Sequence, residues 1–197
     1  MSKSLSLKVF KYRSYTPIPF LVLMVLYASP NVYSLIAGFI IAGIGELIRL
    51  WGVSWAGSET RTTGAVGGTF LIISGPFAYV RNPLYVGNIL IYTGFGFMSN
   101  ALFPFLPVIA LIFFTWQYHT IVYEEEGYLR KAFGAAYEEY FQKVPRYLPG
   151  FTPYKNKSVE QPEFDLREGL KSEKRTLQAF SIVVITILLL WFFRRLS

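Results

Sequence analysis

The polar stretch at 74–88, SGPFAYVRNPLYVGN, holds the first group of side chains that could do chemistry. Arg81 stands beside Asn82 and Pro83, a capping amide followed by the residue that best suits the first helical position. Free backbone amides and the positive end of a helix dipole would therefore lie next to a guanidinium. Such a place binds carboxylate or phosphate groups.

The second group lies at 124–149, EEEGYLRKAFGAAYEEYFQKVPRYLP. It opens with Glu124, Glu125 and Glu126, whose oxygens could accept hydrogen bonds from ribose hydroxyls or from an ammonium group. A ligand with an anionic part and a cationic or hydroxyl-rich part would fit between the two stretches. S-adenosylmethionine fits this description, and so do many other metabolites.

The composition is that of a membrane protein. Of 197 residues, 53% are hydrophobic and only 16% are charged, against about a quarter charged in an average soluble domain. The formal net charge is +7, but the basic residues fall between apolar runs, so we expect the lipid bilayer as partner and no nucleic acid. With no cysteine and one histidine, His119, no metal site is expected.

Apolar runs on both sides of these stretches are expected to position them as membrane-spanning helices. A span needs about 20 apolar residues to cross roughly 30 Å of hydrocarbon. We therefore predict an all-α, polytopic membrane helical bundle of about five transmembrane segments, with a cytosolic amphipathic helix after the fourth. The five runs are 17–28, 31–51, 82–98, 101–123 and 176–193.

Local signals refine this arrangement. The short turn at Ser99 and Asn100 predicts that the third and fourth helices form an antiparallel hairpin, and Gly134 could break the amphipathic helix in two. The glycines within 58–69 have neither the spacing nor the context of a dinucleotide fingerprint.

The second run also carries two charges, Glu46 and Arg49, on a face that it shares with Gly38 and Ala42. Small residues let another helix approach, and the two charges could neutralise each other within the bundle. A structural ion pair is favoured over a polar contact that lines a substrate cavity.

Basic residues set the expected orientation. They gather in the amino-terminal segment and in 123–175, whereas the short loops near 30 and 100 have none, which places the charged loops and the site on the cytosolic side. Arg194 and Arg195 would lie outside after five full spans. The last segment therefore tolerates this bias, lies on the membrane or re-enters it.

Both stretches resemble the integral-membrane methyltransferase superfamily that contains isoprenylcysteine carboxyl methyltransferases and phospholipid methyltransferases. The family pattern is an Arg-His-Pro-x-Tyr or Arg-Asn-Pro-x-Tyr box, a helical hairpin, then Glu-Glu-x-x-Leu, Phe-Gly, two spaced tyrosines and Val-Pro-Arg. The residues that match are Arg81, Asn82, Pro83, Tyr85, Gly87, Glu125, Glu126, Leu129, Phe133, Gly134, Tyr137, Tyr140, Val144, Pro145 and Arg146.

The resemblance covers roughly 52–150 and implies a methyltransferase-like domain at 1–153. A charged linker at 154–175 and an extra C-terminal hydrophobic segment at 176–197 would follow. Catalytic roles are implied for Arg81, Glu125 and Glu126. Binding of S-adenosylmethionine is implied for Tyr79, Arg81, Asn82, Pro83, Tyr85, Gly87, Asn88, Glu126, Leu129 and Tyr137.

The acceptor implied by the resemblance is a lipid, either a phospholipid amine or an isoprenylcysteine carboxylate. Asn82 stands where the isoprenylcysteine enzymes have histidine, and His119 and Thr120 stand near the position of an arginine in those enzymes. An amine would have to lose a proton first, which Glu125 or His119 could take. The alternatives are an NADPH-dependent membrane sterol or lipid reductase and a non-catalytic lipid-binding membrane protein.

Overall fold

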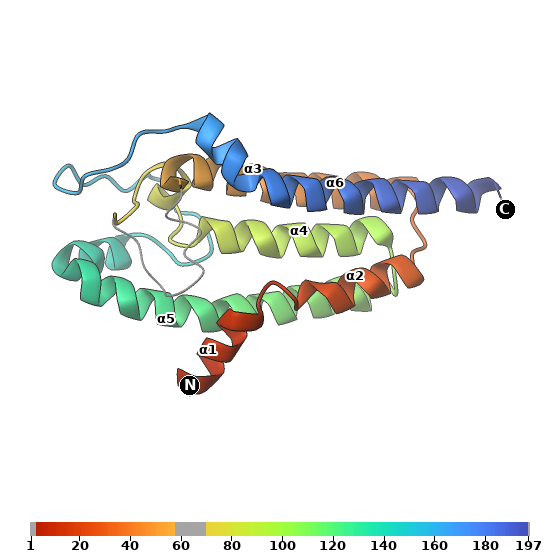
Figure 1. Ribbon diagram of the computed structural model, residues 1–197, viewed down its shortest axis with the longest axis horizontal. Coiled ribbons are helices and arrows are strands. Elements are labelled where there is room, and N and C mark those ends of the chain that lie inside the picture. Colours follow the sequence, from red (N-terminus) through yellow and green to blue (C-terminus); the bar gives the residue numbers. More distant parts are fainter. Residues whose placement is uncertain (1–2, 58–69, 197) are drawn as a thin grey trace. The chain divides into compact units, whose positions relative to one another are not determined.

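A computed structural model describes residues 3–57 and 70–196, and within them all regular structure is helical (Figure 1). The glycines at 64, 67 and 68 lie outside this part of the chain. The expected all-α class is therefore confirmed. The elements are α1 (Lys3–Tyr12), α2 (Pro17–Leu26), α3 (Val32–Ala56), the 3-10 helix η2 (Gly75–Ala78), α4 (Pro83–Ser99), α5 (Phe105–Lys143) and α6 (Leu166–Leu196).

Three of the described helices are long and apolar enough to cross a membrane, namely α3, α5 and α6. With 10 residues, α2 is a shorter apolar helix, and at 1.5 Å per residue it covers about half of the hydrocarbon thickness. The 17 residues of α4 also fall short of a typical span. The chain is thus a membrane helical bundle, while the count of five spans stays a prediction.

The chain divides into two compact units, each built from segments far apart in the sequence. The first unit contains Met1–Glu46, Gly87–Ile121 and Arg175–Ser197, and the second contains Leu47–Val86 and Val122–Lys174. Since α3, α4, α5 and α6 contribute residues to both, each unit is described by itself below.

In the first unit, α3 and α4 approach each other along small residues. A Cβ atom on Gly38 would lie 2.2 Å from the backbone nitrogen of Met98, and one on Gly94 would lie 2.5 Å from that of Ala42. Neither distance leaves room for a side chain, so the two backbones are in direct contact. The prediction that the face with Gly38 and Ala42 receives another helix is confirmed.

In the same unit, α4 and α5 form the expected antiparallel hairpin. Tyr92 of α4 packs on Phe114 of α5 with ring centroids 4.2 Å apart, and a Cβ on Gly96 would lie 3.1 Å from Pro107. Residue numbers thus rise in one helix as they fall in the other. The turn is longer than predicted, because α5 begins at Phe105 rather than at Ala101.

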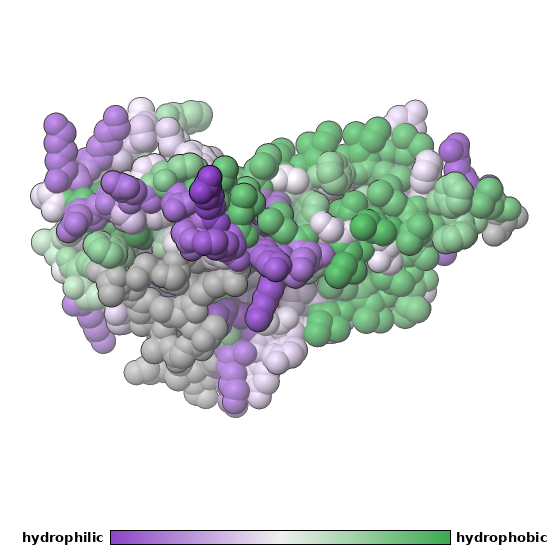
Figure 2. Space-filling view, turned by 45° about the horizontal axis from the view of Figure 1, so that its top comes forward, coloured by the Kyte–Doolittle hydropathy of each residue, from purple (hydrophilic) through white to green (hydrophobic). Residues whose placement is uncertain are grey.

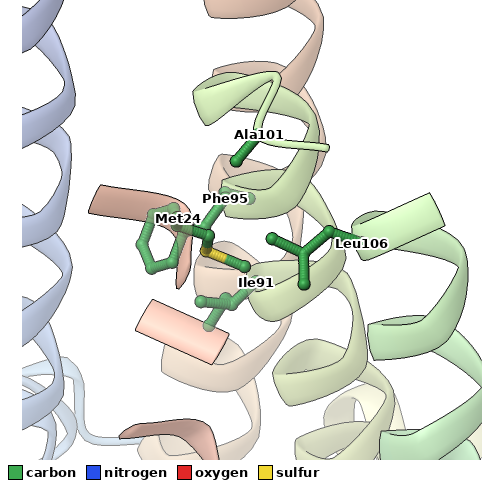
Figure 3. Close-up of a cluster of buried hydrophobic side chains, with 6 residues drawn as sticks. Met24, Ile91, Phe95, Ala101 and Leu106 are labelled. Atoms are coloured by element: carbon green, nitrogen blue, oxygen red, sulfur yellow. The ribbon is translucent and has the colours of Figure 1, made fainter. Parts of the chain in front are cut away.

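A buried apolar cluster joins these helices to α2 (Figure 3). Met24 of α2 meets Ile91 and Phe95 of α4, and Leu106 of α5 closes the cluster. Apolar side chains also remain on the outside, and Figure 2 shows hydrophobic residues gathered over one part of the visible face. They include Ile36, Phe39, Ile40 and Ile44 of α3 and Ile182, Ile185, Leu189 and Phe192 of α6. Such a surface suits contact with lipid.

The second unit has its own core, formed where α5 bends. Gly134 has φ 52° and ψ −126°, which interrupts the helix, and this left-handed region favours glycine. The predicted break is confirmed, but the amphipathic helix does not start separately after Tyr123, because α5 is continuous up to Gly134. Tyr137, Tyr140 and Val144 beyond the break then pack against Leu71 and Ile73.

The end of α3 and the start of α6 are joined in this unit by polar contacts. The guanidinium of Arg49 donates from Nη2 to both carboxylate oxygens of Glu173, at 2.8 Å each, and Glu173 is buried. The amide of Asp165 donates to the carbonyl of Ser54 at 2.8 Å. Arg49, which the sequence paired with Glu46, thus has a buried partner in Glu173, and residues 166–175 are already helical.

Candidate cofactor site

The first part of the site is the segment that leads into α4. Gly75 opens η2 with φ 60°, and a Cβ there would lie 2.1 Å from the ring of Trp55, so only glycine fits this turn. Tyr79 ends η2, and α4 begins at Pro83, as the sequence predicted. Arg81 and Asn82 therefore stand at the mouth of α4, with the backbone amide of Arg81 bonded to the carbonyl of Pro145 at 2.9 Å.

Arg81 connects this segment to the glutamates of α5. Its Nη2 lies 3.2 Å from Oε1 of Glu126, with both side chains less than a tenth exposed. Its Nη1 donates to the carbonyls of Phe141 and Val144, and its guanidinium lies 4.1 Å from the ring centroid of Phe141. Arg81 and Glu126 are 45 residues apart in sequence, so the two polar stretches meet in the second unit.

Glu126 has a second basic partner, Arg146, which follows α5. The Nε of Arg146 donates to Oε1 of Glu126 at 3.0 Å, and its Nη2 donates to Oε2. These hydrogen bonds raise the pKa of Arg146. Two guanidiniums around one carboxylate leave one net positive charge, so the cluster of Arg81, Glu126 and Arg146 could accept a further anionic group.

The predicted site does not include Arg146, although the Val-Pro-Arg motif that contains it matches the family pattern. The signal was present, because a Val-Pro-Arg sequence directly after a helix places a cation where the helix ends. Asn82 also contacts this residue, and its side-chain amide donates to the carbonyl of Arg146 at 3.4 Å.

A second polar contact joins α4 to α5. The hydroxyl of Tyr85 donates to Oε1 of Glu125 at 2.6 Å. Glu125 thus bonds to the phenol of Tyr85, and Glu126 bonds to two guanidiniums. A carboxylate at the position of Glu125 could bind an ammonium group or accept a proton.

The other predicted residues differ in their surroundings. Tyr79 is half-buried, with its ring centroid 6.3 Å from that of Trp51. Tyr137 is fully buried, and Leu129 packs against the same apolar cluster. Gly87 and Asn88 follow in α4 but belong to the first unit. The binding roles of all these residues stay predictions.

Two further side chains bear on the chemistry. Burial raises the pKa of Tyr147 to about 12, although Arg146 opposes this shift, so its phenol is neutral at physiological pH.

His119 is exposed on α5. Among the residues that the structure describes, no three His, Asp or Glu side chains are grouped as metal ligands would be.

These residues fit the groups of S-adenosylmethionine by their chemistry. The net positive cluster of Arg81, Glu126 and Arg146 suits a carboxylate, and Glu125 suits an ammonium group or ribose hydroxyls. The ring of Phe141 already has the guanidiniums of Arg81 and Arg130 over it, 4.1 and 4.0 Å from its centroid.

The fold and this site define a helical membrane protein with a charged cluster where two sequence motifs meet. The chain belongs to the phospholipid methyltransferase family, whose model matches residues 33–136, more than half of its length. It is 37% identical over 84 residues to a protein-S-isoprenylcysteine O-methyltransferase of Schizosaccharomyces pombe, covering 40% of this chain and 33% of the relative.

Two bacterial metal-resistance proteins are also similar. The cobalt-zinc-cadmium resistance protein CzcN of Cupriavidus metallidurans is 29% identical over 133 residues, covering 68% of this chain and 56% of the relative. The nickel-cobalt-cadmium resistance protein NccN of Alcaligenes xylosoxydans xylosoxydans is 26% identical over 91 residues, covering 46% and 41%. The chain thus spans about half the length of these relatives or less. No solved structure matches it.

Proposed function

We propose that the protein transfers a methyl group from S-adenosylmethionine to a lipid or lipid-like acceptor at the cytosolic face of a membrane. The family and the similarity to an isoprenylcysteine methyltransferase support this chemistry. The observation that carries the proposal is the contact of Arg81 with Glu126, 3.2 Å apart and almost fully buried. It joins the two motifs from which a methyltransferase of this family would build its cofactor site.

S-adenosylmethionine, when bound, supplies a methyl group on a sulfonium that reacts by direct displacement. The protein then has to align donor and acceptor and keep water out. Arg81 and Arg146 would hold the carboxylate, while Glu126 fixes both guanidiniums in place. Glu126 bonds to two cations, so in this scheme it is a positioning residue. We therefore do not assign it the catalytic role that the resemblance implied.

The acceptor class decides whether a base is needed. A carboxylate acceptor attacks without losing a proton, whereas a phospholipid ammonium must lose one first. In this scheme Glu125 would take that proton, since its carboxylate lies beside the start of α4 and accepts from the phenol of Tyr85 at 2.6 Å. His119, which is exposed on α5, is the less suitable base.

The test is a methyl-transfer assay on the purified full chain in lipid nanodiscs. Tritiated S-adenosylmethionine is supplied with phosphatidylethanolamine or with N-acetyl-S-farnesylcysteine, and label in the lipid fraction is measured. We expect label in one acceptor and none in an Arg81→Met variant. Absence of label and of cofactor binding in the wild type would reject the proposal, and binding of NADPH instead would favour a reductase.

The cytosolic face can be tested separately because the chain has no cysteine. A single Ser158→Cys variant places a thiol in the exposed segment after α5, and Phe103→Cys places one in the exposed turn before α5. In intact cells, a membrane-impermeant maleimide should label the Phe103→Cys variant and spare the Ser158→Cys variant. The reverse pattern would place the site on the outer face.

A further inference from the structure

The segment after α5 contacts the segment that carries Arg81 at several points along the chain. Residues 144–165 contain no helix or strand, and loops of this length in compact domains are usually functional or linkers. We call residues 144–161 the strap. It lies wholly beyond residues 33–136, which the family model matches.

Backbone hydrogen bonds hold the strap antiparallel to residues 71–82. The amide of Tyr154 donates to the carbonyl of Ala78 at 2.9 Å, and that of Gly150 donates to the carbonyl of Tyr79 at 2.8 Å. The amide of Arg81 donates to Pro145 at 2.9 Å. Along this series the strap numbers fall as the partner numbers rise, so the two chains run in opposite directions.

Gln161 continues this pairing with its side chain. Its Nε2 donates to the carbonyl of Leu71 at 2.8 Å, and its Oε1 accepts from the amide of Ile73 at 2.8 Å. The carboxamide therefore binds the backbone at two points, as a neighbouring strand would. Leu71 and Ile73 are buried, so their backbone groups need such a partner.

The segment that Gln161 grips is packed against the tyrosines of α5. The side chains of Leu71 and Ile73 lie in the cluster that contains Tyr137 and Tyr140. The hydroxyl of Tyr140 in turn donates to the carbonyl of Phe77 at 2.7 Å. Contacts therefore follow one another from Gln161 to η2, and η2 leads directly to Arg81.

We propose that Gln161 is a positioning residue for the cofactor site. By holding the backbone at Leu71 and Ile73, it fixes the place of the segment that presents Arg81 to the anionic part of S-adenosylmethionine. This inference rests on the proposed function. It assigns a role to a residue that lies outside both sequence motifs.

The experiment compares Gln161→Met, which keeps the side-chain bulk and removes the hydrogen bonds to Leu71 and Ile73, with Gln142→Met at an exposed position of α5. Calorimetry with S-adenosylmethionine on the full chain in nanodiscs gives the dissociation constant, and the transfer assay gives KM and kcat. Two lost hydrogen bonds should weaken binding roughly tenfold. We expect KM for the cofactor to rise by a similar factor, kcat to stay within about twofold, and the control to match the wild type.

Gln161→Glu is measured in parallel, because it keeps the acceptor for the amide of Ile73 and remains informative if Gln161→Met does not fold. Its affinity should lie below that of the wild type. Equal cofactor affinity in a folded Gln161 variant and in the wild type would overturn the inference, as would an equal fall in the Gln142 control.

If the wild type binds no S-adenosylmethionine, the proposed function fails. A second measurement then tests whether Gln161 holds residues 71–82 in place. Hydrogen exchange of residues 71–82 should then be faster in Gln161→Met than in Gln142→Met. Unchanged exchange would show that Gln161 does not hold this segment, and the inference would fall with it.

Discussion

The two units of the chain differ in the contacts that hold each of them together internally. The first unit joins its helices through glycines, alanines and apolar side chains, with a backbone-to-backbone approach at Gly38 and Gly94. The second unit also has an apolar cluster, but it adds buried ion pairs at Glu126 and Glu173 and the hydrogen bonds of the strap. Close packing needs no directional partner, whereas each buried charge needs a specific one. We therefore expect the first unit to respond to added volume and the second to lost charge.

The largest effect is expected at Glu126. Glu126→Gln removes the carboxylate between two guanidiniums and leaves Arg81 and Arg146 facing each other. Breaking a buried ion pair by removing one partner costs about 3–5 kcal/mol. Unfolding in a detergent titration should show this loss, with cofactor binding abolished. Glu138→Gln, at a half-exposed ion pair, is the control and should change stability by less than about 1 kcal/mol.

A double-mutant cycle at Arg49 and Glu173 tests whether stability depends on the ion pair itself or only on leaving neither buried charge without the other. Glu173→Leu alone should cost about 3 kcal/mol, because it removes the buried carboxylate that pairs with a guanidinium whose side chain is 13% exposed. Replacing both residues, with Arg49→Met and Glu173→Leu, should recover most of that loss. If the double variant is as unstable as the sum of the two single ones, the pair is not coupled.

In the first unit the expected effect comes from volume. Gly38→Val would place a Cβ 2.2 Å from the backbone of Met98, so α3 and α4 must separate, at a cost of about 1–3 kcal/mol. Gly43→Val is the matched control, because nothing lies within 4 Å of a Cβ at that position. Equal stability of the two variants in a thermal unfolding assay would contradict the close approach of α3 and α4.

The smallest effect is expected at the start of α6. The Oδ1 of Asp165 accepts from the amides of Arg167 and Glu168 at 2.8 and 3.0 Å, which is an N-cap. Asp165→Ala should therefore cost about 1 kcal/mol, and Asp165→Asn should recover most of it. An unchanged midpoint of thermal unfolding for Asp165→Ala would show that the cap contributes nothing.

The sequence predicted the features that follow from local signals. The Asn-Pro pair marked the start of α4, the short turn marked the hairpin, and Gly134 marked the break in α5. Small residues marked the face of α3 that another helix contacts. The meeting of Arg81 with Glu126 came from the resemblance to a family, because nothing in the spacing alone brings them together.

What the sequence did not predict depends on contacts between distant residues. Glu173 as the partner of Arg49, and Gln161 as the partner of Leu71 and Ile73, come from a polar stretch without hydrophobic periodicity. Such a stretch gives no signal for what it contacts. The sequence predicts a charged linker where the first turns of α6 lie, for a similar reason. The many charges of 166–175 leave that part of the helix with only a small buried face.

Arg81 also affects how α5 ends. The last carbonyls of a helix have no partner within it, and here the carbonyl of Phe141 in the last turn, and that of Val144 directly after α5, accept hydrogen bonds from the Nη1 of Arg81. The final turn of α5 is thus completed by a residue made 60 positions earlier. Loss of Arg81 would therefore fray the end of α5 even in the absence of any ligand.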